Sequence, residues 1–207
     1  FANLGLWIAD PAWQSLMEFL QFDRDAIAGG ELWRLVTGNI VHWSAEHCLL
    51  DVAAFAVLGW LYEPSLRRQH ERSNLPLRQS CSLPVLLLVT GYGVGLTVLV
   101  LQPDMLIYRG LSGVDSGLFA VALMLECSEA KHDAIRWWYV IPALVVFITK
   151  LLFEITTGGL FFGTQSLGDL GMPVPLAHLA GAAFAAGCFQ ASRIEQFDET
   201  RQRTASK

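Results

Sequence analysis

A serine at the start of an apolar segment is the first candidate for chemistry in this sequence. The segment from Tyr108 to Phe119 reads YRGLSGVDSGLF, with Ser112 between Gly110 and Gly113. Glycines allow a tight turn, and a helix start presents unpaired N–H groups and the positive end of the helix dipole. Such groups would stabilise an oxyanion formed by attack of Ser112 on a carbonyl. Gly-x-Ser-Gly alone is a weak pattern, because small residues also serve packing in membrane helices.

A histidine in the last apolar segment provides a candidate partner for Ser112. His178 lies in the run LAHLAG and is the only histidine within an apolar span C-terminal to Ser112. Small residues recur every four positions on both segments: Gly113 and Gly117 on one, Ala177, Gly181 and Ala185 on the other. Small faces let helix backbones approach closely, which would bring His178 within reach to take the hydroxyl proton and return it to a leaving amine. The alternative for His178 is a packing residue.

A second polar pair, His47 and Asp51, is four residues apart and so lies on one helix face. This spacing allows two interpretations: His47 donates a hydrogen bond to the oxyanion, or the His47–Asp51 pair fixes the packing of helices. An ionised Asp51 has no donor and would oppose a nearby oxyanion. Asp51 must therefore be protonated by burial or paired with His47. We favour pairing, because an unpaired acid within a membrane span is costly.

Other polar residues have simpler interpretations. His42 precedes the His47 span and is expected to cap or brace the loop. Trp33 and Arg34 lie in an outer loop, where an interfacial aromatic ring and a snorkelling charge are common. Lys150 and Glu154 are four residues apart, and we expect them to form a structural pair that takes no part in chemistry.

Composition sets the class of protein. The chain has 207 residues, of which 53% are hydrophobic and 16% charged. Long apolar segments alternate with short charged connectors, and a bilayer core of about 30 Å requires about 20 apolar residues. The sequence predicts an all-α, polytopic membrane helix bundle. The net charge of −5 and the absence of a basic stripe exclude nucleic acid as a partner. The four cysteines are isolated, without CxxC spacing, so we expect no metal, no disulfide framework and no cofactor.

The chain is predicted to be one domain, residues 1–207. Apolar spans are expected at 47–61, 83–101, 112–125, 137–153 and 173–191. The flanking predictions are the end of a first helix at 1–8, an interfacial or packed loop helix at 10–25, a lid or an ordinary loop at 158–163, and a polar, fraying tail at 193–207. Lys and Arg gather in the connectors after the first and third of these spans and in the tail. That side is predicted to be cytoplasmic, which places Ser112 near the outer face.

These motifs, taken in order, resemble the rhomboid intramembrane serine proteases. The motifs are Trp33-Arg34, His42 and His47 with a polar residue four further on, Gly110-Leu111-Ser112-Gly113, and Ala177-His178-Leu179-Ala180-Gly181. The resemblance implies a six-helix core, with the first helix largely absent from this sequence. It also implies Ser112 as nucleophile, His178 as general base, and His47 with the Ser112 N–H as oxyanion donors. Two positions depart from the family pattern: Asp51 replaces a frequent asparagine, and Ser116 a frequent aromatic residue or histidine.

Within that family the sequence is similar to rhombosortases, through its compact core and the segment from Phe22-Asp23-Arg24 to Thr37. This similarity implies a bacterial inner-membrane enzyme that cleaves membrane-anchored proteins carrying a C-terminal Gly-Gly sorting tail, near the extracytoplasmic face. The alternatives are a general rhomboid protease of other single-span substrates and a non-catalytic rhomboid-like protein that binds membrane clients. A small transporter is disfavoured, because intramembrane charges are few and no inverted pair of broken helices is visible.

Overall fold

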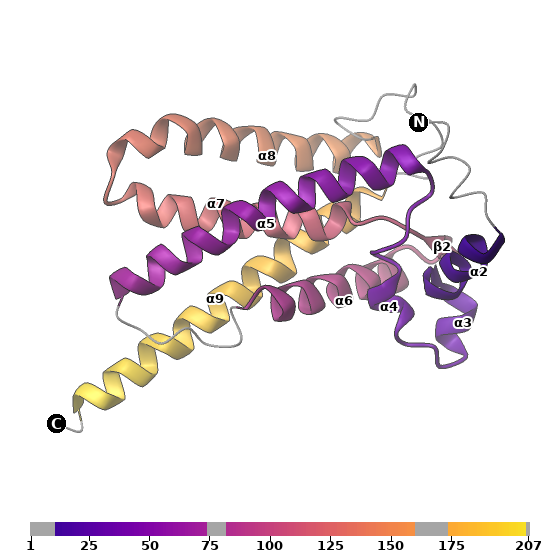
Figure 1. Ribbon diagram of the computed structural model, residues 1–207, viewed down its shortest axis with the longest axis horizontal. Helices are drawn as coiled ribbons and strands as arrows, with labels where there is room; N and C mark the ends of the chain where they lie inside the picture. The colour runs from indigo at the N-terminus through magenta and orange to yellow at the C-terminus, as the bar shows by residue number, and fades with distance from the viewer. Residues whose placement is uncertain (1–10, 74–81, 160–173, 206–207) are drawn as a thin grey trace.

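Five long helices form the body of the molecule in a computed structural model (Figure 1). The structure describes residues 11–73, 82–159 and 174–205, and the side chains of all of these except 66–73 and 194–205. The five helices are α5 (Ala45–Ser73), α6 (Leu83–Leu101), α7 (Ser112–Ala130), α8 (Trp137–Thr157) and α9 (Pro175–Ala205). Within the described part of the chain, three helices are long and apolar enough to cross a membrane, in the stretches Ala45–Ser65, Leu83–Leu101 and Ala134–Thr157. The predicted all-α, polytopic membrane bundle is confirmed.

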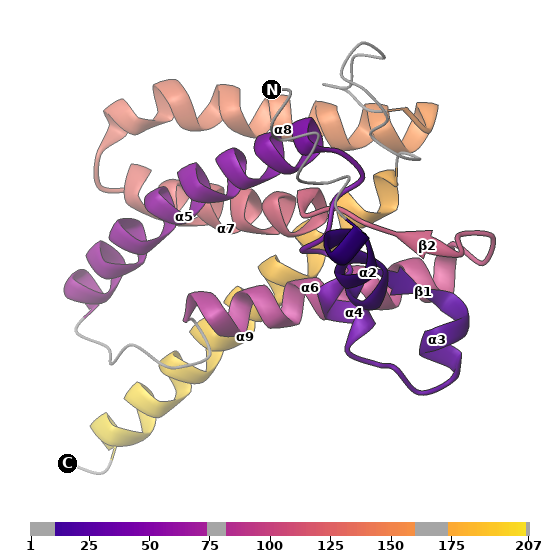
Figure 2. The same cartoon turned by 45° about the vertical axis from the view of Figure 1, so that its right-hand side comes forward.

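Helix α7 is the centre of this bundle. It contacts α5, α6, α8 and α9, and both views show α8 on one side of it and α6 on the other (Figure 1, Figure 2). Because its neighbours enclose it, α7 buries polar residues such as Asp115 and Ser116 that would be costly against lipid. The outer helices α5 and α8 instead expose large apolar side chains, among them Trp60 and Trp138, as contact with lipid requires.

Small residues bring α7 and α9 together. A Cβ added at Gly113 would lie 2.9 Å from the Ala177 carbonyl oxygen, and one at Gly117 would lie 2.8 Å from that of Gly181. A Cβ at Gly181 would overlap the Gly113 carbonyl. The close approach expected from the small faces is therefore present, and it brings the N-terminal ends of α7 and α9 side by side.

Short elements cover the end of the bundle at which α7 begins (Figure 2). They are α2 (Pro11–Leu20), β1 (Phe22–Asp23), α3 (Arg24–Ala28), α4 (Arg34–Thr37) and β2 (Ile107–Tyr108), while η2 (Ala134–Arg136) precedes α8 at the other end. The strands β1 and β2 are antiparallel, with Phe22 opposite Tyr108. The fully buried Phe22 ring meets the Tyr108 ring edge-on. This ribbon, which the sequence did not predict, holds the segment before Ser112 against the N-terminal elements.

Two arginines fasten these short elements. Arg24 donates to four carbonyl oxygens at and just beyond the end of α6: those of Val98, Leu99, Gln102 and Met105. Carbonyls at a helix end lack partners within the helix, so Arg24 caps α6. Arg34 donates to the carbonyls of Glu18 and Gln21 and to the Glu31 carboxylate. Only 7% of Arg34 is exposed. The expectation that its side chain snorkels to the membrane interface is therefore wrong.

Several predicted boundaries also differ. Helix α5 continues to Ser73, past the expected end of its span at residue 61, and α9 continues to Ala205 through the tail that was expected to fray. Charged residues end a membrane span without ending a helix, because Glu, Gln and Arg are good helix formers. The helix expected at 10–25 ends at Leu20, where β1 follows. The predicted first-helix remnant at 1–8, and all but the first two residues of the predicted lid at 158–163, lie outside the described residues.

Candidate active site

Ser112 and His178 face each other across the α7–α9 contact. Ser112 is the first residue of α7 and His178 the fourth of α9. The His178 Nε2 atom lies 3.0 Å from the Ser112 Oγ atom. His178 is buried and Ser112 is partly exposed. The structure thus brings together the two residues that the sequence singled out, at the distance a proton transfer requires.

The turn before Ser112 depends on Gly110. Its φ of +141° is a conformation that other residues rarely adopt. The Gly110 carbonyl accepts a hydrogen bond from the Tyr108 hydroxyl, and its N–H donates to the Gly38 carbonyl. The first α-helical bond of α7 runs from the Asp115 N–H to the Leu111 carbonyl. The N–H groups of the first turn, including that of Ser112, precede this bond and have no acceptor within the helix.

Asp51 ties α5 to this turn. Its Oδ2 atom accepts a hydrogen bond of 2.9 Å from the Leu111 N–H. The Nε2 atoms of His42 and His47 each lie 3.3 Å from the same oxygen, and the two imidazole rings meet edge-on. Asp51 therefore accepts a hydrogen bond from Leu111 and lies beside both histidines, and its contact with His47 is the pairing that the sequence favoured. His42 lies where a residue bracing the loop would be.

His47 is packed against the turn that carries Ser112. A Cβ added at Gly110 would lie 3.1 Å from the His47 Cε1 atom, so a larger residue would displace this ring. While the His47 Nε2 atom faces Asp51, its Nδ1 atom is buried and has no hydrogen-bond partner among residues 11–73, 82–159 and 174–205. A buried nitrogen without a partner costs free energy, which a polar group of a bound substrate would recover.

Glu154 completes the group from a third helix. Its Oε2 atom lies 2.7 Å from the His178 Nδ1 atom and 2.8 Å from the Lys150 Nζ atom. The expected Lys150–Glu154 pair is present, and Glu154 also contacts the candidate base, a contact that the sequence did not predict. Glu154 follows Val140 and Phe147 at intervals of seven residues, and the structure buries all three on the inward face of α8.

A comparison with protein-family models agrees with this geometry. The model described as the Rhomboid domain matches residues 29–191, which include every residue discussed in this site. The chain belongs to the rhomboid family. Rhomboids are known as intramembrane serine proteases, so the family supports a multipass membrane protein of protease type. A search of curated proteins found no match.

The other residues that the sequence indicated as site candidates make contacts within helices, between helices and in loops. The Ser116 hydroxyl donates to the Ser112 carbonyl one turn earlier on α7. Trp33 is 45% exposed and its ring lies 5.9 Å from that of Phe19, while Arg34 holds the loop carbonyls described above. Gly113 and Gly181 form the α7–α9 contact. Among the described residues, no cluster of three or more His, Cys, Asp or Glu side chains is arranged to hold a metal ion.

The Asp51 contacts give a testable expectation for this rhomboid. Asp51→Asn keeps a side-chain oxygen for the Leu111 N–H, whereas Asp51→Ala removes the acceptor of that partly buried donor and so loosens the turn. We expect Asp51→Asn to cleave at least about tenfold faster than Asp51→Ala, because a loosened turn displaces Ser112, and a displacement of about 1 Å can cost about 10²-fold in rate. Steady-state cleavage in detergent measures the difference. Equal rates for the two variants would mean that Asp51 does not position the turn.

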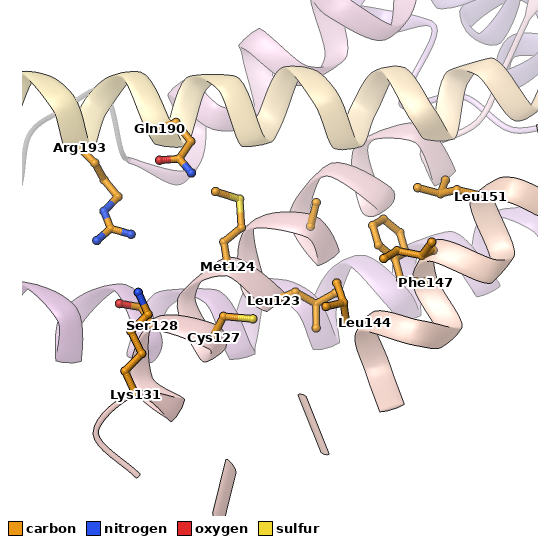
Figure 3. Close-up of a pocket in the computed structure, with 12 residues that line it drawn as sticks. Leu123, Met124, Cys127, Ser128, Lys131, Leu144, Phe147, Leu151, Gln190 and Arg193 are labelled. Carbon is orange, nitrogen blue, oxygen red and sulfur yellow. The ribbon is translucent and has the colours of Figure 1, made fainter. Parts of the chain in front are cut away.

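A separate groove lies between α7, α8 and α9 (Figure 3). Its volume is about 410 Å³. Its walls are apolar, with Met124, Phe147 and Leu151 among them, and Lys131 and Arg193 lie at one end. Neither Ser112 nor His178 lines it, so this groove is distinct from the candidate active site.

Proposed function

We propose that this rhomboid is an intramembrane serine endopeptidase that uses Ser112 as nucleophile and His178 as general base. The observation that carries the proposal is the 3.0 Å contact between the Ser112 Oγ and His178 Nε2 atoms. A pure binding protein needs neither side chain in this arrangement. The position of Ser112 at the N-terminus of α7 adds a second argument, because backbone donors and the helix dipole point toward the reacting atoms.

The reaction follows from this contact in two halves. In the first, the Ser112 Oγ atom attacks the scissile carbonyl carbon while His178 Nε2 takes the hydroxyl proton. The tetrahedral intermediate then expels the amine, which receives that proton from Nε2, and leaves an acyl-enzyme. In the second, a water molecule loses a proton to Nε2 and attacks the ester carbonyl. Release of the acid returns the proton to the Ser112 oxygen.

The oxyanion would be held by the Ser112 N–H and by His47. The first belongs to the unpaired first turn of α7, and the second is packed against Gly110, two residues before the nucleophile. Asp51 acts indirectly in this proposal. Its carboxylate accepts from the Leu111 N–H and lies 3.3 Å from the Nε2 atoms of His42 and His47, so it fixes the turn and orients His47, and does not itself donate to the oxyanion. No metal or cofactor takes part.

The proposed substrates are membrane-anchored proteins cleaved near the extracytoplasmic face of a bacterial inner membrane. The orientation is supported by Lys131 and Arg136, which lie between α7 and α8 at the end of the bundle away from Ser112 (Figure 1). Basic residues favour the cytoplasmic side. The resemblance of the Phe22 to Thr37 segment to rhombosortases supports a finer substrate class, a C-terminal tail containing Gly-Gly.

Labelling with a serine-reactive fluorophosphonate tests the nucleophile. We expect the wild-type protein in detergent to be labelled and Ser112→Ala to be unlabelled. Ser128→Ala is the matched control, because Ser128 is on the same helix and is also partly exposed; it should be labelled like the wild type. Labelling that persists in Ser112→Ala, or no labelling of the folded wild type, would contradict the proposal. The second result would favour a client-binding protein.

The substrate class needs its own comparison. A single-span protein with a Gly-Gly-containing tail should be cleaved faster than the same protein with Leu-Leu in place of Gly-Gly. If both are cleaved equally, the enzyme is a general rhomboid protease, and the rhombosortase assignment fails while the nucleophile assignment stands.

A further inference from the structure

We infer that Glu154 positions His178 for catalysis and that Lys150 balances the Glu154 charge, so that Glu154 supports the Ser112–His178 pair as the third member of a triad. This inference rests on the proposed function and extends it to two residues of α8. Glu154 touches neither substrate nor the reacting atoms. It acts through the imidazole, as a positioning residue.

The three side chains form a continuous chain of contacts. The His178 Nε2 atom lies 3.0 Å from the Ser112 Oγ atom, and the His178 Nδ1 atom lies 2.7 Å from the Glu154 Oε2 atom. Both ring nitrogens are thus engaged, by groups from two different helices. An imidazole held at both nitrogens has a fixed ring orientation, which keeps Nε2 directed at the nucleophile.

The proton positions select Glu154 over Lys150 as the partner of His178. To accept the Ser112 proton, the neutral imidazole must have a free Nε2 atom and carry its hydrogen on Nδ1. That hydrogen needs an acceptor. The Lys150 Nζ atom is also near Nδ1, at 3.1 Å, but an ammonium group has no acceptor, whereas a carboxylate has only acceptors. Glu154 therefore stabilises the tautomer that general-base catalysis uses.

The charge of Glu154 explains why Lys150 lies beside it. Glu154 is only 1% exposed, and a buried carboxylate is strongly unfavourable without a partner. The Lys150 Nζ atom supplies that partner at 2.8 Å. Lys150 and Glu154 carry opposite charges, so this pair adds no net charge beside His178. When it takes the Ser112 proton, the new positive charge lies beside the Glu154 carboxylate, while the negative charge forms on the oxyanion at the other side.

The decisive variant is Glu154→Gln, which keeps the shape of the side chain. Its amide can rotate to donate to Nδ1, which would favour the tautomer with hydrogen on Nε2. We expect kcat to fall by about 10²- to 10⁴-fold, with KM changed by less than about threefold, because only the chemical step needs the tautomer. Glu154→Asp keeps an acceptor at shorter reach and should recover part of the lost kcat.

A second measurement separates positioning from a structural role. If Glu154 acts only through His178, then Glu154→Gln in a His178→Ala background should cause no further loss of residual activity. A purely structural residue would lower that residual activity as well. Glu126→Gln is the matched control, because Glu126 also pairs with a cation, Arg136, at 2.7 Å, but near the far end of α7. It should keep its kcat.

The double variant Lys150→Met, Glu154→Gln serves as the control for folding, because it removes both charges of the pair together. It should stay folded by thermal unfolding in detergent and still show the reduced kcat. Wild-type kcat in folded Glu154→Gln or in the double variant would overturn the triad. The proposed function would stand in that case, because it depends on fluorophosphonate labelling of Ser112, which is measured independently.

Discussion

Alanine at Ser112, alanine at His178 and alanine at both positions are expected to lower kcat/KM by a similar factor, on the order of 10³ to 10⁶. The reason is the single contact between Oγ and Nε2: a hydroxyl without its base is a poor nucleophile, and a base without the hydroxyl has nothing to activate. Once one side chain is removed, the other contributes little, so the double variant should be hardly worse than either single one. Steady-state cleavage of a single-span substrate measures all three.

Folding must be compared in the same preparations. Neither alanine removes a large apolar side chain, so the thermal midpoints in detergent should stay close to that of the wild type. Ser128→Ala should keep its activity and serves as the matched control. Losses that multiply in the double variant would show that Ser112 and His178 act independently, which would refute the dyad even if both residues prove important.

The bundle could be predicted because its signals are local. Apolar segments of bilayer length predict helices, and the segment 83–101 matches α6 residue for residue. The contact between α7 and α9 was also predictable, since Gly113, Gly117 and Gly181 are spaced for close backbone approach. The His47–Asp51 contact joins neighbours four residues apart on one helix, so spacing alone indicates it.

The rest of the site depends on contacts between distant segments. Asp51 accepts from Leu111, 60 residues away, and Arg24 reaches carbonyls 74 to 81 residues away. No periodicity links such positions. The strands β1 and β2 have two residues each, too short for a detectable alternation. The sequence therefore predicts which residues are candidates for the site. The long-range contacts that hold these residues in place have to be read from the structure.

Glu154 shows a different limit. Its spacing from Lys150 predicted the pair correctly but suggested that the pair was self-sufficient. A carboxylate has two oxygens and several lone pairs, so pairing with one cation leaves room for a second donor. Val140 and Phe147 lie on the same buried face of α8 as Glu154, but α8 is apolar on nearly all sides, so its sequence does not indicate which face points inward. The direction in which a helix face points, and not only the nearest opposite charge on the same helix, determines which further group a buried carboxylate contacts.

Gly181→Ala is expected to disrupt both folding and catalysis, because its Cβ would overlap the Gly113 carbonyl across the α7–α9 contact. Neither backbone can yield without moving a helix. Overpacking of this kind costs about 1–3 kcal/mol or more. His178 lies three residues earlier on the same helix, so a shift of about 1 Å would also carry Nε2 away from Ser112, and such a displacement can cost about 10²-fold in rate.

Gly187→Ala is the matched control for Gly181→Ala. Gly187 lies on the same helix, and a Cβ there would meet nothing within 4 Å. Both variants gain the same intrinsic helix propensity, up to about 1 kcal/mol, so the difference between them isolates the contact with α7. We expect Gly187→Ala to keep full activity and an equal or higher thermal midpoint in detergent. If Gly181→Ala proves as stable and as active as Gly187→Ala, the close approach of the two helices is not what sets the distance from Ser112 to His178.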